Sequence, residues 1–494
     1  MIIPSAPYTA ANNATYKSPV YAVLIEGITD CFVFTSGVFL NSYTAGTVRK
    51  TGKTISGISR KVSLEHGFST TSSMTLTILD TDSHTITSQL SKLTPYLDGS
   101  PRQIKIFAGY DTVNFGDMVS TGDALQIYTG MIKKVHLPKV RGPYNIEIQD
   151  AQQIFAKDLF TDAVALVAPA LPTLLTGIPY DLILKILTST GAGTNGVYDV
   201  LPVTWGLAIP QSMIDIATFE YERSIWYGTN EVSIAITDRV MAKEFLEKEL
   251  LKVVSAHLIM KGNGQISIKS MRPIIGSTAG LPTITNDSIV GDILYNRNIE
   301  GVINDVTFQY DYDPYTNDFL KRSRFVDSTS LLKYTDAKPL LIQSKGLRGS
   351  RSAGIAGFSD LGADAFVEDR ATRIFQRMAY PPQEINFTTF FDKHLMEEGD
   401  IFLITHPEIP SEQDSMGITD EPMEVISKDV DWQNGRVKWT SLDYFPNSNA
   451  KYALFGPTTL LSYELESTAN KNTYAFFSRW DGTMKDGTIG YNFL

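Results

Sequence analysis

Alternation of apolar and polar residues dominates the first third of the chain. Residues 73–79 place a methionine, a leucine and an isoleucine on one face of an extended segment and two threonines on the other. Residues 103–108 and 144–149 alternate in the same way, and turns rich in Gly, Asp and Ser separate these runs. A period of two residues is typical of strands that bury one face. We therefore expect an antiparallel β-barrel or sandwich over residues 19–155.

In the middle of the chain the spacing of apolar residues changes to three and four, which indicates helices. Residues 180–187 form one such pattern and residues 240–254 form another. Thr237 or Asp238 is suited to cap the start of the second helix. Its apolar stripe contains Ala242, Phe245, Leu246, Leu250 and Val253. A hairpin over residues 257–269 follows, with glycines at the reversal, where a tight turn needs a positive φ.

Strands return after about residue 289, interrupted by two different segments. Residues 344–362 are rich in Gly, Ser and Arg and predict a linker. Residues 364–379 predict an amphipathic helix. Its expected buried face contains Val367, Ala371, Ile374 and Met378. Its expected exposed face contains Arg370, Arg373 and Arg377. Farther on, Asn434–Gly435 predicts a type I′ turn in a hairpin.

Length and composition fit several ordered units. The chain has 494 residues, of which 43% are hydrophobic and 20% charged. Such a chain forms ordered globular structure, and its length suggests roughly three units. We expect a multidomain, mainly β protein with two antiparallel β-barrel domains flanking a helix-containing α+β domain. The expected divisions are an N-terminal arm (1–18), a first barrel (19–155), the α+β domain (156–290), a second barrel containing the linker and helix 344–379 (291–445), and an aromatic C-terminal segment that docks on a partner (446–494).

Charge and cysteine usage narrow the classes of partner. Lys and Arg number 43 against 54 Asp and Glu, for a formal net charge of −11, which argues against a surface that neutralises many phosphates. Cys31 is the only cysteine, so we expect a buried apolar residue and no disulfide. The first residues lack the features of a secretory signal. Residues 163–180 carry no charge, but three prolines interrupt them, so we expect a buried linker and no membrane contact.

Catalytic and cofactor signals were sought in the motifs of the chain. Six histidines are scattered without the spacing of a zinc site: His66, His84, His136, His257, His394 and His406. Gly191–Gly196 matches G-x-G-x-x-G, but a helix pattern precedes it, so we expect a flexible interhelical loop and no dinucleotide site. We expect no enzyme activity, and no catalytic, cofactor-binding or metal-ligating residues.

Three charged segments have both a purely structural and a functional interpretation. Asp311–Asp318 resembles the opening of a calcium loop, but it lacks the loop glycine and the closing glutamate, so a solvated hairpin turn is expected. Glu397–Glu398 is expected in a turn between strands, because nothing places an opposing acid across a cleft. Arg348 and Arg351 make their segment basic enough to touch an acidic partner.

Several phrases, taken in order, resemble the baseplate hub, or tail-tip hub, proteins of tailed bacteriophages. The likeness covers about residues 17–445. Its phrases are the extended run Ser59–Asp80, then Ile106–Tyr110, Tyr128–Ile132 and Tyr144–Gln149, and later Ser344–Leu347, the helix with Arg370 and Arg373, Gly399–Thr405 and Glu421–Ile426.

This resemblance implies a homotrimer in which each subunit supplies two tube-type β-barrels, so that three subunits form a quasi-sixfold ring continuing a hexameric tail tube. The implied partners are a distal tail protein, the C-terminus of the tape-measure protein, and a tail fibre or central spike. DNA would pass through the lumen without sequence-specific binding. The implied location is the tail tip of the virion, after assembly in the host cytoplasm. No cofactor is implied.

Two other functions fit a β-rich chain with many carboxylates and aromatics. One is a tail-associated hydrolase acting on cell walls or polysaccharides, which would need a pair of acids converging in a cleft. The other is a receptor-binding tail protein, in which the aromatic C-terminal segment meets the host surface.

Overall fold

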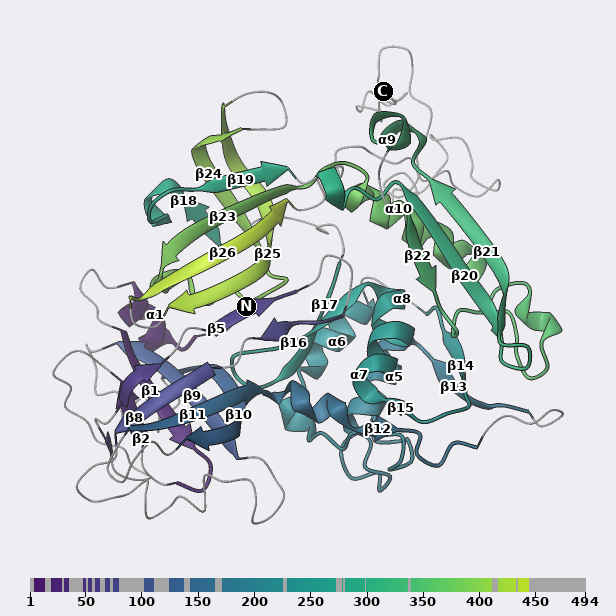
Figure 1. Cartoon of the computed structure of the whole chain (residues 1–494), viewed down its shortest axis with the longest axis horizontal. Helices are drawn as coiled ribbons and strands as arrows, with labels where there is room; N and C mark the ends of the chain where they lie inside the picture. Colours follow the sequence, from purple (N-terminus) through teal and green to yellow (C-terminus); the bar gives the residue numbers. More distant parts are fainter. Residues whose placement is uncertain are drawn as a thin grey trace, which may run out of the picture.

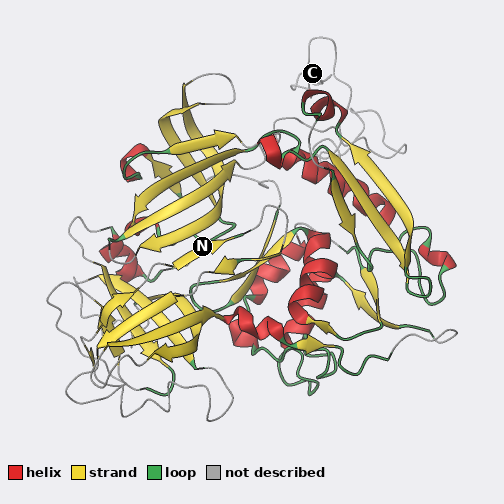
Figure 2. Cartoon of the chain, in the orientation of Figure 1, coloured by secondary structure: helices red, strands yellow, loops and turns green. Residues whose placement is uncertain are grey.

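The structure is a computed structural model of the whole chain. It describes residues 4–13, 19–28, 31–34, 48–49, 52–55, 58–62, 67–71, 74–79, 102–110, 124–136, 143–164, 171–224, 229–271, 278, 280–297, 299–335, 339–410, 416–431 and 434–443. The fold is mainly β and multidomain, with most of the helices beside the two large sheets (Figure 2). Two large curled sheets lie one above the other, and a helical region and a smaller sheet lie beside them (Figure 1).

The first sheet has eight strands in the order β3-β2-β1-β9-β10-β11-β8-β4. Their bounds are β1 Pro19–Ile25, β2 Cys31–Phe34, β3 Val48–Arg49, β4 Gly52–Ile55, β8 Met74–Leu79, β9 Gln103–Tyr110, β10 Leu125–His136 and β11 Pro143–Asp150. All neighbours are antiparallel except β2 and β3. The alternation is confirmed in β8, where Met74, Leu76 and Ile78 are buried, and Cys31 is buried as expected. Helix α1, Ala6–Asn12, packs against β9.

The second sheet has the order β18-β24-β25-β26-β23-β19, and two strands from the N-terminal part of the chain extend it. Its bounds are β18 Thr283–Thr285, β19 Leu294–Arg297, β23 Gln383–Phe390, β24 Ile401–Pro410, β25 Met416–Asp431 and β26 Arg436–Asp443, with β5 Ile58–Lys61 and β7 Thr70–Thr71. Strand β5 pairs antiparallel with β25 and lies between the two sheets (Figure 1). A reversal before β26 is present, and Gly435 has a φ of 61°. The predicted type I′ turn is wrong, because Asp431 pairs with Arg436 and the reversal is therefore longer than the two residues of such a turn.

Helices fill the middle of the chain, as their spacing predicts. Their bounds are α5 Pro179–Thr188, α6 Ile216–Glu222, α7 Ala242–Phe245, a π-helical stretch η4 Leu246–Leu251 and α8 Lys252–Val254. The predicted stripe of the second helix is buried. The strands of this region are β6 Gly67–Phe68, β12 Asp158–Leu159, β13 Thr173–Gly177, β14 Val232–Ile236, β15 Val240–Met241, β16 Ala256–Met260 and β17 Ile266–Ser270, the last two forming the predicted hairpin. Short 3₁₀ turns are η1 Ala151–Ala156 and η2 Gln211–Met213.

A three-stranded sheet, β21-β20-β22, lies beside the helical region and carries α10 against it (Figure 1). The bounds are β20 Asp305–Asp313, β21 Asp318–Val326, β22 Leu340–Gln343, α9 Ser328–Lys333 and α10 Ala363–Met378, with 3₁₀ turns η5 Asn286–Ser288, η6 Ile299–Gly301, η7 Ser352–Gly354 and η8 Phe391–Lys393. The turn between β20 and β21 contains the acidic segment that the sequence placed in a hairpin.

Two apolar clusters connect these parts. One joins the inner faces of the first and second sheets with Tyr8 of α1. The other joins α5, the helical stretch 242–254 and the hairpin β16–β17 with β20, β22 and α10. Residues 303–379 thus share their core with the helical region and not with the second sheet. The exact division of the chain into domains stays a prediction.

The expected exposed face of α10 is wrong at two positions. Its apolar face is buried as predicted, but Arg370 and Arg377 are only 2% and 1% exposed. Arg377 lies beside Glu424 of β25, with Nη1 2.5 Å from Oε2, so a long-range ion pair accounts for its burial. Arg373 is half-buried and forms an ion pair at 2.6 Å with Asp369.

The predicted linker 344–362 is also wrong in part. Ser344, Leu347 and Arg348 are buried, and the segment connects β22 to α10 through ordered turns. The Arg348 guanidinium donates through Nε to the carbonyl of Ser233 at 2.9 Å and lies over the Phe358 ring. Burial lowers the pKa of Arg348 to about 10. It is therefore a core residue and not a contact for an acidic partner, whereas Arg351 is exposed.

Two smaller expectations also need correction. The second helix begins after Met241 without a side-chain cap, because strand β15 intervenes between Asp238 and the helix. The expected buried linker 163–180 instead contains β13 and the start of α5, and its Leu171 and Val164 are exposed. The C-terminal segment 446–494 and the turn after β8 lie outside the described residues.

Candidate functional site: a polar junction between the sheets

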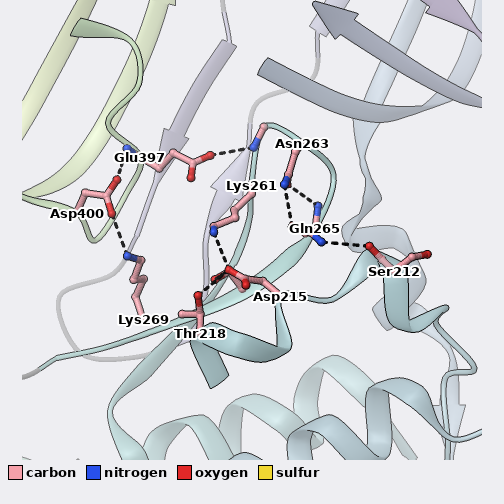
Figure 3. A network of polar contacts seen from close by, with 11 residues as sticks. Ser212, Asp215, Thr218, Lys261, Asn263, Gln265, Lys269, Glu397 and Asp400 are labelled. Atoms are coloured by element: carbon pink, nitrogen blue, oxygen red, sulfur yellow. Dashed lines mark hydrogen bonds and ion pairs between the residues drawn. The ribbon is translucent and has the colours of Figure 1, made fainter. Parts of the chain in front are cut away.

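The tip of the β16–β17 hairpin is the place where three parts of the molecule meet. Residues 261–265 contact strand β10 of the first sheet, the start of α6, and the loop 397–400 of the second sheet (Figure 3). The hairpin itself closes through the N–H of Lys261, which donates to the carbonyl of Gln265 at 2.9 Å. This junction joins polar side chains from separate segments of the chain.

On the helical side, Asp215 just before α6 holds the hairpin. Its Oδ2 accepts from Lys261 Nζ at 2.6 Å, from Thr218 Oγ1 at 2.6 Å and from Ser267 Oγ at 3.0 Å (Figure 3). Burial by itself would raise the pKa of Asp215, but these hydrogen bonds and the charge of Lys261 leave it below its usual value. The aspartate is therefore a charged anchor with several donors.

On the side of the second sheet, two carboxylates meet the hairpin. Glu397 Oε1 accepts from the N–H of Gly262 at 2.8 Å, and Lys269 Nζ lies 2.9 Å from Asp400 Oδ1 (Figure 3). Asp400 Oδ2 also accepts from the N–H of Glu397 at 2.9 Å, which fixes the loop. Burial opposes ionisation of Asp400, but positive charge, first of all that of Lys269, keeps its pKa below the usual value.

On the side of the first sheet, the hairpin approaches β10 so closely that side chains would not fit. Gln126 Nε2 donates to the carbonyl of Asn263 at 2.9 Å. A Cβ added to Gly262 would lie 2.6 Å from the carbonyl oxygen of Ile127. Gly264 has a φ of 84° and lies equally close to Thr129. The expectation of positive φ is confirmed at Gly264, while Gly262 is required by the close approach.

More buried charges lie behind this junction, between β5 and β25. Arg60, Lys428 and Glu398 are all buried. Lys428 Nζ donates to the carbonyls of His394 and Met396 at 2.5 and 2.7 Å, and burial lowers its pKa despite the nearby glutamates. Burial raises the pKa of Glu398, against the opposing effects of Arg60 and Lys428.

Helix α1 adds a hydrogen bond across the same pair of sheets. Tyr8 Oη lies 2.9 Å from His394 Nε2, and His394 Nδ1 lies 2.5 Å from the carbonyl oxygen of Phe391. A carbonyl only accepts, so Nδ1 carries a proton. His394 also stacks on the Phe391 ring at 4.0 Å. Burial, first of all, raises the pKa of Tyr8, so its phenol keeps its proton.

These groups neutralise one another and fix three chain segments in place. Glu397–Glu398 lies in a turn between strands, as the sequence predicted. Its burial and its bond to Gly262 were missed, because the partners are 135 residues apart and no local pattern marks them. The sequence signal at this site was the pair Gly262 and Gly264 in a short polar turn. It predicted the reversal between β16 and β17 but not the contacts that the reversal makes with other segments.

Solved structures with a similar fold were found. The chain is similar in fold to tail proteins. A tail protein from Neisseria meningitidis has a TM-score of 0.42 and 9% identity, over 86% of this chain and 98% of that chain. A 43 kDa tail protein of a prophage from Shewanella oneidensis has a TM-score of 0.38 and 11% identity, over 87% of this chain and 99% of that chain. A prophage tail protein from Listeria monocytogenes has a TM-score of 0.39 and 8% identity, over 88% of this chain and 97% of that chain.

No protein-family model matches the sequence, and no curated protein matches it. Glu397–Glu398 lies in the junction, whereas the segments Gly191–Gly196 and Asp311–Asp318 lie outside it. His136 pairs with Glu147 at 2.7 Å, while His257, His394 and His406 are buried on separate elements. His66 and His84 lie outside the described residues. Within the part of the chain that the structure describes, no three His, Cys, Asp or Glu residues gather in a way that would hold a metal ion.

Residues Gly191–Gly196 form an interhelical loop, as expected, but the loop is folded around a carboxylate. Asp199 accepts from the N–H groups of Thr190, Thr194 and Asn195 at 2.7 to 2.9 Å. Hydrogen bonding, first of all from the Thr190 side chain, lowers the pKa of Asp199 to about 2. Asp199 therefore accepts hydrogen bonds from the backbone N–H groups that a bound phosphate would need.

The acids of the segment Asp311–Asp318 point to different partners. Asp311 is buried and accepts from the N–H of Gly349 and from Ser352 Oγ at 2.6 and 2.5 Å. Asp313 accepts from the N–H of Tyr315 inside the turn. The hairpin turn is confirmed, but the expectation that it is solvated is wrong at Asp311, which supports the segment before α10.

Among the described helices, none has the length and apolar character needed to span a membrane.

Proposed function

We propose that this chain is a structural hub protein of a phage tail tip, acting by assembly and not by catalysis. In this proposal three copies form a ring, and each copy contributes its two large β-sheets as tube-type barrel walls. The order of the sequence segments that resemble phage hub proteins supports this class of protein and the trimeric state that the resemblance implies. The structure supports the assignment of the two large sheets to the barrel walls, because a common apolar cluster fixes these two curled sheets to one another.

The observation that carries the proposal is the open edge of the second sheet. Strand β19 ends the described sheet and pairs only with β23. Leu294 and Tyr295 on this strand are 67% and 52% exposed, and Ile299 just after it is 63% exposed. An edge strand with exposed apolar residues is a template for pairing with another chain, and monomers usually block it with charge or proline. A neighbouring subunit would complete this edge.

The remaining parts of the proposal follow from that ring. Its neighbours would be a distal tail protein above, the C-terminus of the tape-measure protein inside, and a tail fibre or central spike below, at the tail tip of the virion. The formal net charge of −11 suits a channel through which DNA passes without binding. Assembly of the ring would take place in the host cytoplasm, before the tail is complete.

Mass photometry and negative-stain electron microscopy of the purified chain test this proposal. We expect particles of three times the chain mass, seen as rings with threefold symmetry. The double variant Leu294→Lys/Tyr295→Lys should shift these particles towards monomer, because two charges on the edge oppose strand pairing.

The matched control is Leu332→Lys, which changes an apolar residue on α9 that is even more exposed and lies outside the second sheet. It should leave the assembly unchanged. Monomers at every concentration of the wild-type chain would contradict the proposal, and so would trimers that tolerate the β19 double variant. Circular dichroism confirms that each variant is folded before its mass is compared.

A further inference from the structure

A groove of about 510 Å³ lies between the helical region and the small sheet, away from the junction and from β19. Strand β14, the helical stretch 242–254 and the ends of β21 and β22 line it. Its lining includes Ala235 of β14, Phe245 of α7, Phe319 of β21 and Gln343 of β22. Two strand edges therefore border one cavity.

The wall formed by β14 presents unused backbone groups. Strand β14 pairs with β13 on one edge, and Ser233 lies opposite Thr176. The N–H of Ser233 points away from β13, because it donates to the carbonyl of Gly346 at 2.8 Å. In an antiparallel pair the outward residues alternate, so the N–H and C=O of Ala235 also point away from β13. They face the groove.

The wall formed by β22 has the same character. Among the described strands β22 pairs with β20 only, and the N–H of Ser344 just after it donates to the carbonyl of Gln309 at 3.0 Å. Successive residues of a strand point in opposite directions, so the backbone of Gln343 faces away from β20. The chain after β22 meets β14 at Ser233, whose N–H donates to the carbonyl of Gly346. The groove is thus an opening bordered by β14 and the end of β22.

Charges around the opening favour a negatively charged occupant. Four basic residues line it: Arg239, Lys248, Lys252 and Lys345. Three acids line it: Asp238, Glu244 and Glu249. Glu244 is paired with Lys248 at 2.7 Å, and Glu249 accepts from the N–H of Lys345 at 3.1 Å. Burial raises the pKa of Glu249 above its usual value, against the opposing charges of nearby lysines.

We propose that this groove binds an extended, acidic segment of a partner protein, which adds as a strand to the free edge of β14. Backbone bonds to Ala235 would give the affinity, as in other complexes formed by strand addition. The basic side chains would select carboxylates on the incoming segment. The inserted strand would connect β13–β14 with the sheet β22-β20-β21. This inference stands apart from the proposed ring, because neither β19 nor the large sheets take part.

Fluorescence anisotropy with labelled heptapeptides tests the site on the full chain. The probe alternates valine and glutamate, and its counterpart alternates valine and lysine. We expect the acidic peptide to bind, the basic peptide to bind at least about tenfold more weakly, and added salt to weaken the acidic complex. Ala235→Pro should also weaken binding about tenfold or more, because proline removes the N–H and opposes strand addition.

Leu174→Pro is the matched control. Leu174 lies directly opposite Ala235 and its N–H points out of the other edge of the same two-stranded sheet, so proline is equally tolerated there. This variant should bind the acidic peptide like the wild type. Hydrogen exchange on the wild-type chain gives a readout that needs no variant, because a bound strand should slow exchange of the Ala235 amide.

Several outcomes would overturn the proposal. They are the absence of binding by either peptide, equal binding of both, equal binding by Ala235→Pro and wild type, or an unchanged exchange rate at Ala235. Free glutamate that competes as well as the peptide would show a pocket for small carboxylates and would also overturn it. Slower exchange at Ala235, with binding lost only in Ala235→Pro, supports it.

Discussion

At the scale of single residues, two neighbouring acids of the junction have pKa shifts of opposite sign, although burial alone would raise the pKa of both. Asp400 has Lys269 at 2.9 Å, and its pKa is lowered. Glu398 lies deeper among Arg60 and Lys428 without such a direct pair, and its pKa is raised. The difference is physical, since a close opposite charge favours the ionised form and desolvation disfavours it. Sequence spacing gives no hint of it, because 131 residues separate Lys269 from Asp400.

Asp400→Asn should remove an acid-sensitive part of the stability. The folded-state pKa of Asp400 lies below the unfolded value near 3.8, so its contribution is complete above about pH 4 and is lost as pH falls towards the folded pKa. We expect a loss of about 2 to 3 kcal/mol at pH 7, from leaving Lys269 unpaired. Urea unfolding from pH 2 to 7 measures this, with Asp292→Asn on the exposed surface as the control. Equal pH profiles for Asp400→Asn and wild type would contradict it.

Glu398→Gln should act with the opposite sign. The folded-state pKa of Glu398 lies above the ordinary value of 4.5. Stability from this group is therefore complete below about pH 4.5 and declines as pH rises through the folded pKa. The glutamine variant should lose less stability than the wild type between pH 4.5 and 8. A steeper decline in the variant, measured by urea unfolding across that range, would refute the assignment.

At the scale of elements, periodicity predicted several strands and the longer helices. Strand β8, the hairpin β16–β17, α5 and the helical stretch 242–254 were found where the spacing placed them. The arginine face of α10 was predicted wrongly, because a charged stripe looks solvated unless its distant partner is known. The segment 344–362 looked like a linker for a similar reason, since its glycines and serines serve ordered turns around Arg348.

Gly262→Ala tests the close approach of the hairpin to β10. The added methyl group would lie 2.6 Å from the carbonyl oxygen of Ile127, which is backbone and cannot move aside cheaply. We expect a loss of about 1 to 3 kcal/mol in unfolding free energy. Gly354→Ala is the control, because an added Cβ there meets nothing within 4 Å. A loss of the same size in both variants would argue against steric contact at β10.

At the scale of the whole molecule, one ion pair connects the two apolar clusters. Arg377 belongs to α10, which packs in the helical cluster, and Glu424 belongs to β25 of the second sheet. The mainly β class and the order of strand-rich and helix-rich regions were predictable from composition and period. The sharing of cores was not, because it depends on which surfaces meet after folding.

Arg377→Leu should weaken the coupling between these clusters. It leaves Glu424 buried beside an apolar residue, so we expect a loss of about 3 to 5 kcal/mol. Differential scanning calorimetry should show a broader transition or two transitions in place of one. Adding Glu424→Leu should restore most of the loss, since no charge is then left buried. A double variant as unstable as the single one would show that other contacts of Arg377 dominate.

Strand β5 has a consequence for how the protein is made. Its Arg60 carbonyl accepts from Ser427 of β25, a partner that lies 367 residues later. At ordinary rates of translation, β5 would leave the ribosome roughly 20 to 70 seconds before β25. During that time it has an unpaired edge, so the nascent chain needs protection from aggregation until synthesis is almost complete. Ribosome-bound chains that stop before residue 416 should therefore bind a chaperone that the finished protein releases.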